Sequence, residues 1–137
     1  VPTYFPDWFP TLAKMASADV PSTAKLDGID MTGILGGKAA PKRHELMIWD
    51  FHNYGGIIAI RDGKWKALRR NLLGRRGKPA KLADWELYDI EADPKEKNNL
   101  AAKHKDIVKR LEKAWLETRT VEPDFKIPSV DGKIELP

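Results

Sequence analysis

The sequence contains no cysteine, which excludes disulfides, thiolate metal sites and a cysteine nucleophile. It also lacks any apolar run near the roughly 18 residues that a membrane-spanning helix needs. We find no HExxH or H-x₃₋₅-H pattern for zinc, no phosphate loop and no G-x-S-x-G motif. The acidic residues are scattered, so we expect no metal site. Chemistry alone therefore predicts a noncatalytic α+β domain.

What the sequence does contain is typical of a globular protein, with 42% hydrophobic residues among 137. The net charge of +4 is too mild to indicate a nucleic-acid or membrane partner. Because the chain begins at Val1 without an initiator methionine or a signal peptide, we expect it to be an excised fragment or a processed product.

The segment 56–68 gives the clearest structural signal in the sequence, because two apolar runs flank Asp62-Gly63. Asp-Gly suits both central positions of a type I′ turn, so the segment predicts a β-hairpin. Ile57 and Ala59 would share one strand face, and Ile58 and Ile60 the other. Neither face is polar, so we expect the hairpin in the middle of a sheet that is covered on both sides.

The expected fold class is α+β: a four-stranded antiparallel sheet with a C-terminal helix packed on one face, preceded by a short helical segment. The chain supplies poor cover for the other face. In order, we expect a helix over about 7–17, a helical turn over 30–35, a strand over 45–51, the hairpin to about 69, a strand over 85–90, a helix over about 104–120 and an extended tail over 121–137.

The histidines are His44, His52 and His104. His52 follows a predicted strand, and loops held by a rigid sheet often carry function. We therefore take His52 and its neighbour Asn53 as candidate substrate-binding residues, although the residues alone favour an ordinary loop. We assign no catalytic residue and no metal ligand.

The segment 61–81 holds nine Lys or Arg residues against one Asp, a local charge of about +8. Such a segment could bind an anion such as nucleic acid, sulfated glycan or phosphate, but a solvated hairpin loop is the favoured interpretation. No aromatic residue lies between Arg69 and Lys81, which argues against stacking on nucleic-acid bases. For the five tryptophans, core packing is favoured over carbohydrate stacking.

Several segments occur in a fixed order along the chain: Asp7-Trp8-Phe9-Pro10-Thr11-Leu12, Leu26-Asp27-Gly28-Ile29-Asp30 with Ile34-Leu35 and Gly37, Ile48-Trp49-Asp50-Phe51-His52, Ala59-Ile60-Arg61-Asp62-Gly63-Lys64-Trp65-Lys66, and Glu86-Leu87-Tyr88-Asp89-Ile90 continuing through Asp93-Pro94-Lys95-Glu96 to Asn99-Leu100-Ala101. In this order and at this spacing they resemble the C-terminal part of the arylsulfatase family, over about residues 5–116. One departure is Asp50, where the family often has Glu.

The resemblance implies a parent enzyme that hydrolyses sulfate esters with a formylglycine, made from Cys or Ser in a C/S-x-P-x-R motif, beside a calcium ion. None of Ser17, Ser22 and Ser129 lies in such a motif, so we expect neither cofactor in this chain and no activity from it alone. The implied domains are 1–40, the last helical segment of the catalytic domain; 41–122, the C-terminal subdomain; and 123–137, an extended tail.

The partners that the resemblance implies are the missing N-terminal catalytic domain and, in the whole enzyme, a sulfate ester substrate. A periplasmic or secreted location is expected on the same basis. The loop 52–55 would form one rim of the substrate cleft. We expect the apolar groups of residues 1–40 to be buried against a second chain, with fold-back over the sheet as the alternative. The competing hypothesis is a stand-alone basic module that binds sulfated glycan or nucleic acid.

Overall fold

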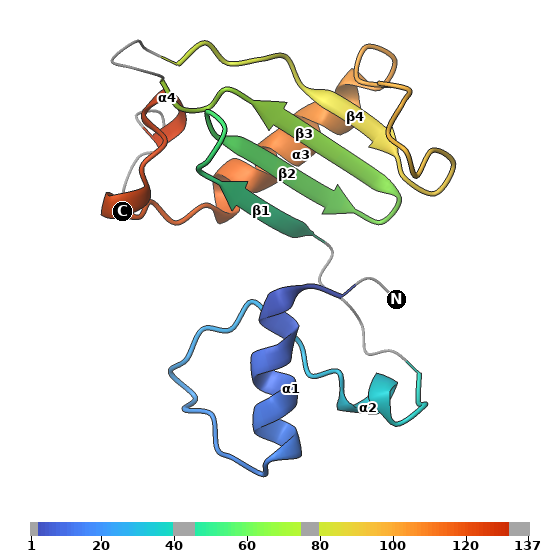
Figure 1. The fold of residues 1–137 in the computed structure, drawn as a ribbon, viewed down its shortest axis with the longest axis vertical. Coiled ribbons are helices and arrows are strands. Elements are labelled where there is room, and N and C mark those ends of the chain that lie inside the picture. Colours follow the sequence, from blue (N-terminus) through green and yellow to red (C-terminus); the bar gives the residue numbers. More distant parts are fainter. Residues whose placement is uncertain (1–2, 40–45, 75–79, 132–137) are drawn as a thin grey trace. The chain divides into compact units, whose positions relative to one another are not determined.

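The computed structural model describes residues 3–39, 46–74 and 80–131. The chain divides into two compact units, residues 1–44 and 45–137, which Figure 1 shows as a ribbon. The first unit contains η1 (Phe5–Asp7), α1 (Trp8–Met15) and α2 (Thr32–Leu35). The second contains β1 (Met47–Phe51), β2 (Ile57–Asp62), β3 (Trp65–Arg70), β4 (Glu86–Asp89), α3 (Lys105–Thr118), η2 (Pro123–Phe125) and α4 (Pro128–Asp131).

Two fully buried polar side chains, Asp7 and Thr11, hold the first unit together. The Asp7 carboxylate accepts hydrogen bonds from the backbone N–H groups of Tyr4 and Ile29, both at 3.0 Å. The Thr11 hydroxyl donates to the Asp7 carbonyl at 2.6 Å and accepts from the Met31 N–H at 2.9 Å. Buried polar groups are costly unless they are paired. Here the bonds from Ile29 and Met31 join η1 and α1 to the segment before α2.

Gly28 lies where this segment passes the start of η1. A Cβ atom at this position would stand 2.0 Å from the carbonyl oxygen of Pro6, which is far inside van der Waals contact. The close approach explains why the Leu26–Asp30 segment carries a glycine at its centre.

The four strands of the second unit form one antiparallel sheet in the order β1-β2-β3-β4. The predicted hairpin is therefore confirmed as the central pair, β2 and β3. The predicted type I′ turn at Asp62-Gly63 is wrong, because Asp62 still pairs with Trp65 and the two loop residues are Gly63 and Lys64. Of these two only Gly63 has a positive φ, at 57°, whereas a type I′ turn needs positive φ at both positions.

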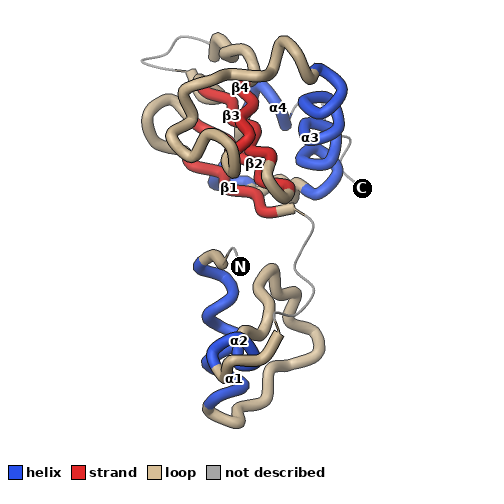
Figure 2. The backbone as a smooth tube through the Cα atoms, turned by 90° about the vertical axis from the view of Figure 1, so that its right-hand side faces the viewer, coloured by secondary structure: helices blue, strands red, loops and turns tan. Residues whose placement is uncertain are grey.

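Helix α3 covers one face of the sheet, as expected, and Figure 2 shows it alongside the strands. Its buried residues, Leu111 and Trp115, join the core cluster with Ile58, Ile60 and Leu87 from the strands. We call this the inner face of the sheet. Alternation along the strands places the remaining side chains on the opposite, outer face: Trp49, Ala59, Arg61 and Lys66 are among them.

The predicted extended tail is wrong for its described part, which ends at residue 131. Pro123 and Pro128 instead begin the short helical segments η2 and α4, since proline fits the first helical turn. Ile127 and Val130 are buried in the core cluster, so this segment completes the inner side of the unit. Residues 132–137 lie outside the described residues.

The other predicted elements are found with shifted ends. The helix expected over 7–17 is η1 followed by α1, the strand expected over 45–51 is β1, and the helix expected over 104–120 is α3. Residue 45 lies outside the described residues. Across the described ranges, no helix is both long enough and apolar enough to cross a bilayer.

We predict that Leu111→Ala lowers the free energy of unfolding of the second unit by about 2–5 kcal/mol, because Leu111 is fully buried and its truncation leaves a cavity. Urea denaturation followed by tryptophan fluorescence measures this. Lys113→Ala on the exposed side of the same helix is the control and should change stability by less than about 0.5 kcal/mol. Equal effects of the two variants would contradict the assigned core.

Candidate functional site

The loop that follows β1 carries the predicted site residues His52 and Asn53. His52 is half-buried, and its Nε2 lies 3.4 Å from Oδ1 of Asp50. Its ring meets the ring of Phe125 edge to face, with centroids 5.6 Å apart. Asn53 is exposed. The structure thus places both residues together at the end of β1, with His52 held on two sides.

Arg119, the residue after α3 in the position of its C-cap, connects this loop to the C-terminal segment. Its guanidinium bonds to the Asp50 carboxylate through Nη1 and to both carboxylate oxygens of Asp131, at 2.6 and 3.1 Å. Asp131 also accepts a 2.6 Å bond from the backbone N–H of Ile127. Asp50 lies between the Arg119 guanidinium and the His52 ring.

Burial makes these charges strongly interdependent, because the side chains of Arg119 and Asp131 are only 8% and 6% exposed. Burial alone would raise the pKa of Asp131, but the hydrogen bonds from Arg119 and from the Ile127 N–H outweigh it, so the pKa lies below 3.8. The hydrogen bond to Asp131 raises the pKa of Arg119 despite its burial. Both groups are therefore charged at neutral pH.

The backbone of the loop is fixed as well. Tyr54, Gly55 and Gly56 have φ values of 55°, 84° and 81°, which is the left-handed region that favours glycine. The carbonyl oxygens of Gly55 and Gly56 accept bonds from the N–H groups of Leu73 and Leu72, at 2.8 and 3.2 Å. The loop is thereby attached to the chain that leaves β3, and its side chains are presented by a rigid support.

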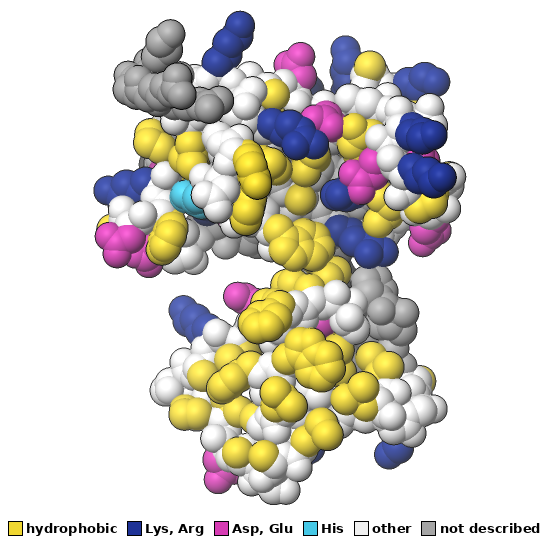
Figure 3. All heavy atoms as spheres, in the orientation of Figure 1, with side chains coloured by type: hydrophobic (Ala, Val, Ile, Leu, Met, Phe, Trp, Pro, Cys, Tyr) yellow, Lys and Arg dark blue, Asp and Glu magenta, His cyan; other side chains and the backbone are white. Residues whose placement is uncertain are grey.

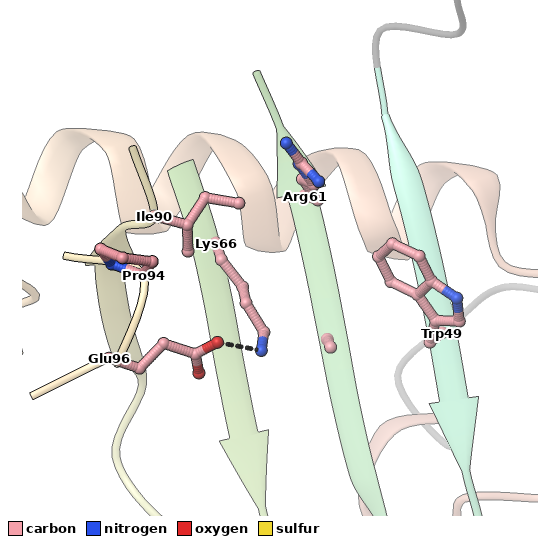
Figure 4. A pocket seen from close by; sticks show the side chains of 7 residues that line it. Trp49, Arg61, Lys66, Ile90, Pro94 and Glu96 are labelled. Atoms are coloured by element: carbon pink, nitrogen blue, oxygen red, sulfur yellow. Dashed lines mark hydrogen bonds and ion pairs between the residues drawn. The ribbon is translucent and has the colours of Figure 1, made fainter. Parts of the chain in front are cut away.

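A concave feature lies on the outer face of the sheet, away from α3 (Figure 4). It is an open pocket of about 510 Å³. Lys66 and Glu96 on one side form an ion pair at 2.6 Å. The complete lining is Trp49, Ala59, Arg61, Lys66, Ile90, Pro94 and Glu96.

Sequence reasoning did not identify either the Arg119 contacts or this pocket. It assigned the tryptophans to the core, which is right for Trp115, whereas Trp8 and Trp49 are 45% and 39% exposed. Trp49 of β1 pairs with Ala59 of β2, which is two residues before Arg61. A tryptophan and an arginine this close on one face of the sheet could have indicated the pocket. Nothing in the local sequence marks Arg119.

The basic segment is largely neutralised where the structure describes it. Ion pairs join Lys64 to Asp89, Lys66 to Glu96, Arg69 to Glu112 and Arg70 to Glu86. Lys66, Arg69 and Arg70 lie on strand β3 rather than in a loop. Residues 75–79 lie outside the described residues. No cluster of three or more His, Asp or Glu side chains that could hold a metal is found among the residues described.

Comparison with known proteins gives a consistent result, although no protein-family model matches the sequence. Arylsulfatase A of Bos taurus is 38% identical over 63 residues, covering 44% of this chain and 12% of that protein. N-acetylgalactosamine-6-O-sulfatase of Bacteroides thetaiotaomicron is 28% identical over 125 residues, covering 83% of this chain and 23% of that protein. The crystal structure of Ps i-CgsB in complex with k-i-k-neocarrahexaose matches with a TM-score of 0.60 and 28% identity, over 92% of this chain and 26% of that one.

The homologues of this chain are thus sulfatases, which confirms the resemblance drawn from its motifs. The shared fold likewise confirms the predicted α+β class. The chain spans only 12% and 23% of the lengths of the two curated relatives. The chain is therefore similar to a minor part of each of these sulfatases.

We predict that Asp131→Asn loosens the segment 119–131 at pH 7, because the variant leaves the buried Arg119 cation with one charged partner fewer. The expected cost is about 3 kcal/mol of local stability. Since folding lowers the pKa of Asp131, its contribution is present above the unfolded value of 3.8 and is lost as the pH falls through the folded value. The wild type should therefore loosen only in strong acid.

Hydrogen exchange of the Ile127 amide, measured at several pH values, tests this prediction. Asp124→Asn is the matched control, because Asp124 is exposed and its side chain is outside the Arg119 contacts. Equal protection of the Ile127 amide in the wild type and Asp131→Asn at pH 7 would contradict the prediction.

Proposed function

We propose that this chain is the C-terminal subdomain of an arylsulfatase-like sulfuric ester hydrolase and completes the substrate cleft of the whole enzyme. The observation that carries the proposal is the match to N-acetylgalactosamine-6-O-sulfatase across 83% of this chain. Sulfated saccharides are the substrate class that the named relative supports, and the carbohydrate bound to Ps i-CgsB agrees with this class.

The loop 52–55 is the part of this chain that we assign to the rim of that cleft. Its support is geometric, since Asp50 and Phe125 fix the His52 ring while the loop backbone is bonded to residues 72 and 73. A binding group held in place in advance loses little conformational entropy when substrate arrives. Asn53, exposed beside His52, would contribute an amide donor and acceptor.

The chemistry of ester cleavage belongs to the parent enzyme outside this chain. The resemblance implies a formylglycine nucleophile beside calcium, and neither fits the residues present: there is no C/S-x-P-x-R motif and no metal-binding cluster among the described residues. The role proposed for this chain is therefore to bind and orient the substrate. A periplasmic or secreted location follows from the same resemblance.

The first unit supplies a surface for the missing catalytic domain. Hydrophobic side chains gather on this unit, as Figure 3 shows. Phe9, Leu12 and Met15 of α1 are 59%, 55% and 63% exposed. An apolar surface of this kind marks an interaction site. We propose that the catalytic domain covers it in the parent, and that a second copy covers it when the chain is alone.

The chain alone is expected to show no sulfatase activity, because the nucleophile is carried elsewhere. The measurement is hydrolysis of an aryl sulfate with calcium present, with the full-length parent as the positive control. Turnover that survives repurification and is absent from a mock preparation would contradict this expectation. Such turnover would also contradict the competing hypothesis, because a stand-alone binding module has no catalytic activity.

In the full-length enzyme, His52→Ala is expected to lower kcat/KM by tenfold or more, about 1.4 kcal/mol of transition-state stabilisation. The reason is loss of a positioned ring at the cleft rim. His104→Ala is the matched control, since His104 stacks against Trp65 at the opposite end of the sheet. An effect of His52→Ala below about 1 kcal/mol would identify the loop as an ordinary one.

A further inference from the structure

The outer face of the sheet contains a charge arrangement that costs stability. Arg61 of β2 and Lys66 of β3 are directly opposed in the ladder, and like charges in this position repel. Glu96 neutralises one of them through its 2.6 Å ion pair with Lys66. One positive charge is left over at this position.

That remaining charge is on Arg61. Within the described part of the second unit, its side chain makes one polar contact, from Nε to the carbonyl oxygen of Gly63 at 3.1 Å. The neighbouring Asp62 points the other way and pairs with Arg110 of α3 at 2.6 Å. The Nη groups of Arg61 therefore keep donors for a planar, bidentate interaction with an anion.

Among the described residues, the other cations on the outer-face side of the strands, Lys66 and Arg70, are paired, which sets this position apart. Arg70 pairs with Glu86 at 3.1 Å, and Glu86 also accepts a 2.6 Å bond from the Tyr88 hydroxyl. That hydrogen bond raises the pKa of Tyr88 to about 12. Of the cations that the described strands present on this face, Arg61 is thus the one with no acidic partner among the described residues.

The shape around Arg61 adds an apolar surface to this cation. Trp49 and Ala59 are directly paired across β1 and β2, and the small side chain of Ala59 leaves room above it beside the indole ring. In Figure 4 Trp49 and Arg61 stand on one side of the pocket, while Ile90, Pro94 and the Lys66–Glu96 pair stand on the other. The volume of about 510 Å³ is typical of small-molecule sites.

We propose that this pocket binds the sulfated sugar ring of a saccharide, with the ring against the Trp49 indole and the sulfate on the Arg61 guanidinium. The substrate class rests on the proposed function, whereas the location rests on the pocket itself. Glu96 accepts a hydrogen bond from a hydroxyl of the same sugar while it keeps its ion pair with Lys66. The pocket would be a saccharide subsite on the outer face, separate from the His52 loop at the end of β1.

The test is a titration of the 137-residue chain, followed by NMR, with a 6-O-sulfated chondroitin disaccharide. The unsulfated disaccharide and inorganic sulfate are titrated in parallel. We expect the sulfated disaccharide to shift the Trp49 indole and Arg61 amide signals, and to bind at least fivefold more tightly than either of the other two. Equal binding of inorganic sulfate would overturn the proposal, because the sugar ring would then not be recognised.

Variants separate this pocket from nonspecific attraction to a basic protein. Arg61→Gln and Trp49→Ala should each raise the Kd at least fivefold, while Lys113→Gln, the same charge change on the exposed side of α3, should leave it unchanged. Trp49→Phe keeps an aromatic ring and should retain most of the binding, which guards against a folding defect in Trp49→Ala. Equal weakening by Lys113→Gln, or no effect of Arg61→Gln, would overturn the proposal.

Failure here is distinguishable from failure of the proposed function. No shift of the Trp49 indole with any ligand would mean that none of them binds in this pocket, and this proposal would be wrong. The sulfatase activity of the full-length parent and its response to His52→Ala are measured separately and do not depend on this result.

Discussion

The contact on which the second unit depends is the packing of Leu111 and Trp115 against the inner face of the sheet. A sheet with two apolar central strands needs cover, and one amphipathic helix covers one face only. Ile127 and Val130 extend the same side. The outer face carries Trp49 and Arg61 beside the buried side chains of Leu68 and Tyr88, and the pocket lies on this face. The location of the pocket is thus a consequence of how the core is built.

Several residues in the motifs that this chain shares with sulfatases form hydrogen bonds within the fold. Asp7 and Thr11 join α1 to the segment before α2. The Asn99 side chain accepts from the N–H groups of Leu87 and Ala101, at 3.1 and 2.9 Å, and Asp93 accepts from Lys97 and Asn98. Asp7 and Thr11 are buried, where donors and acceptors must be paired, whereas the contacts of Asp93 and Asn99 fix the backbone of a largely exposed loop.

Sequence reasoning found the elements whose signals are local, namely the central hairpin β2–β3 and the amphipathic helix α3. It missed the turn type at Gly63, because the turn is shifted by one residue from Asp62-Gly63. It missed the helical segments after Pro123, because these depend on the burial of Ile127 in the core. It placed His52 and Asn53 in a loop at a strand end, as observed. It could not foresee Arg119, since Asp50 lies 69 positions away and pairing at that separation leaves no periodic pattern.

The two units differ in how far each covers its own apolar side chains. The second unit contains its own core, and Arg119 closes its C-terminal segment onto β1 through Asp131 and Asp50. The His52 loop is therefore supported from within the unit. The first unit pairs its buried polar groups but leaves α1 side chains exposed, and an apolar surface gains free energy only when another surface covers it. In the proposed parent, α1 would then supply attachment to the catalytic domain, while the second unit would supply substrate contacts.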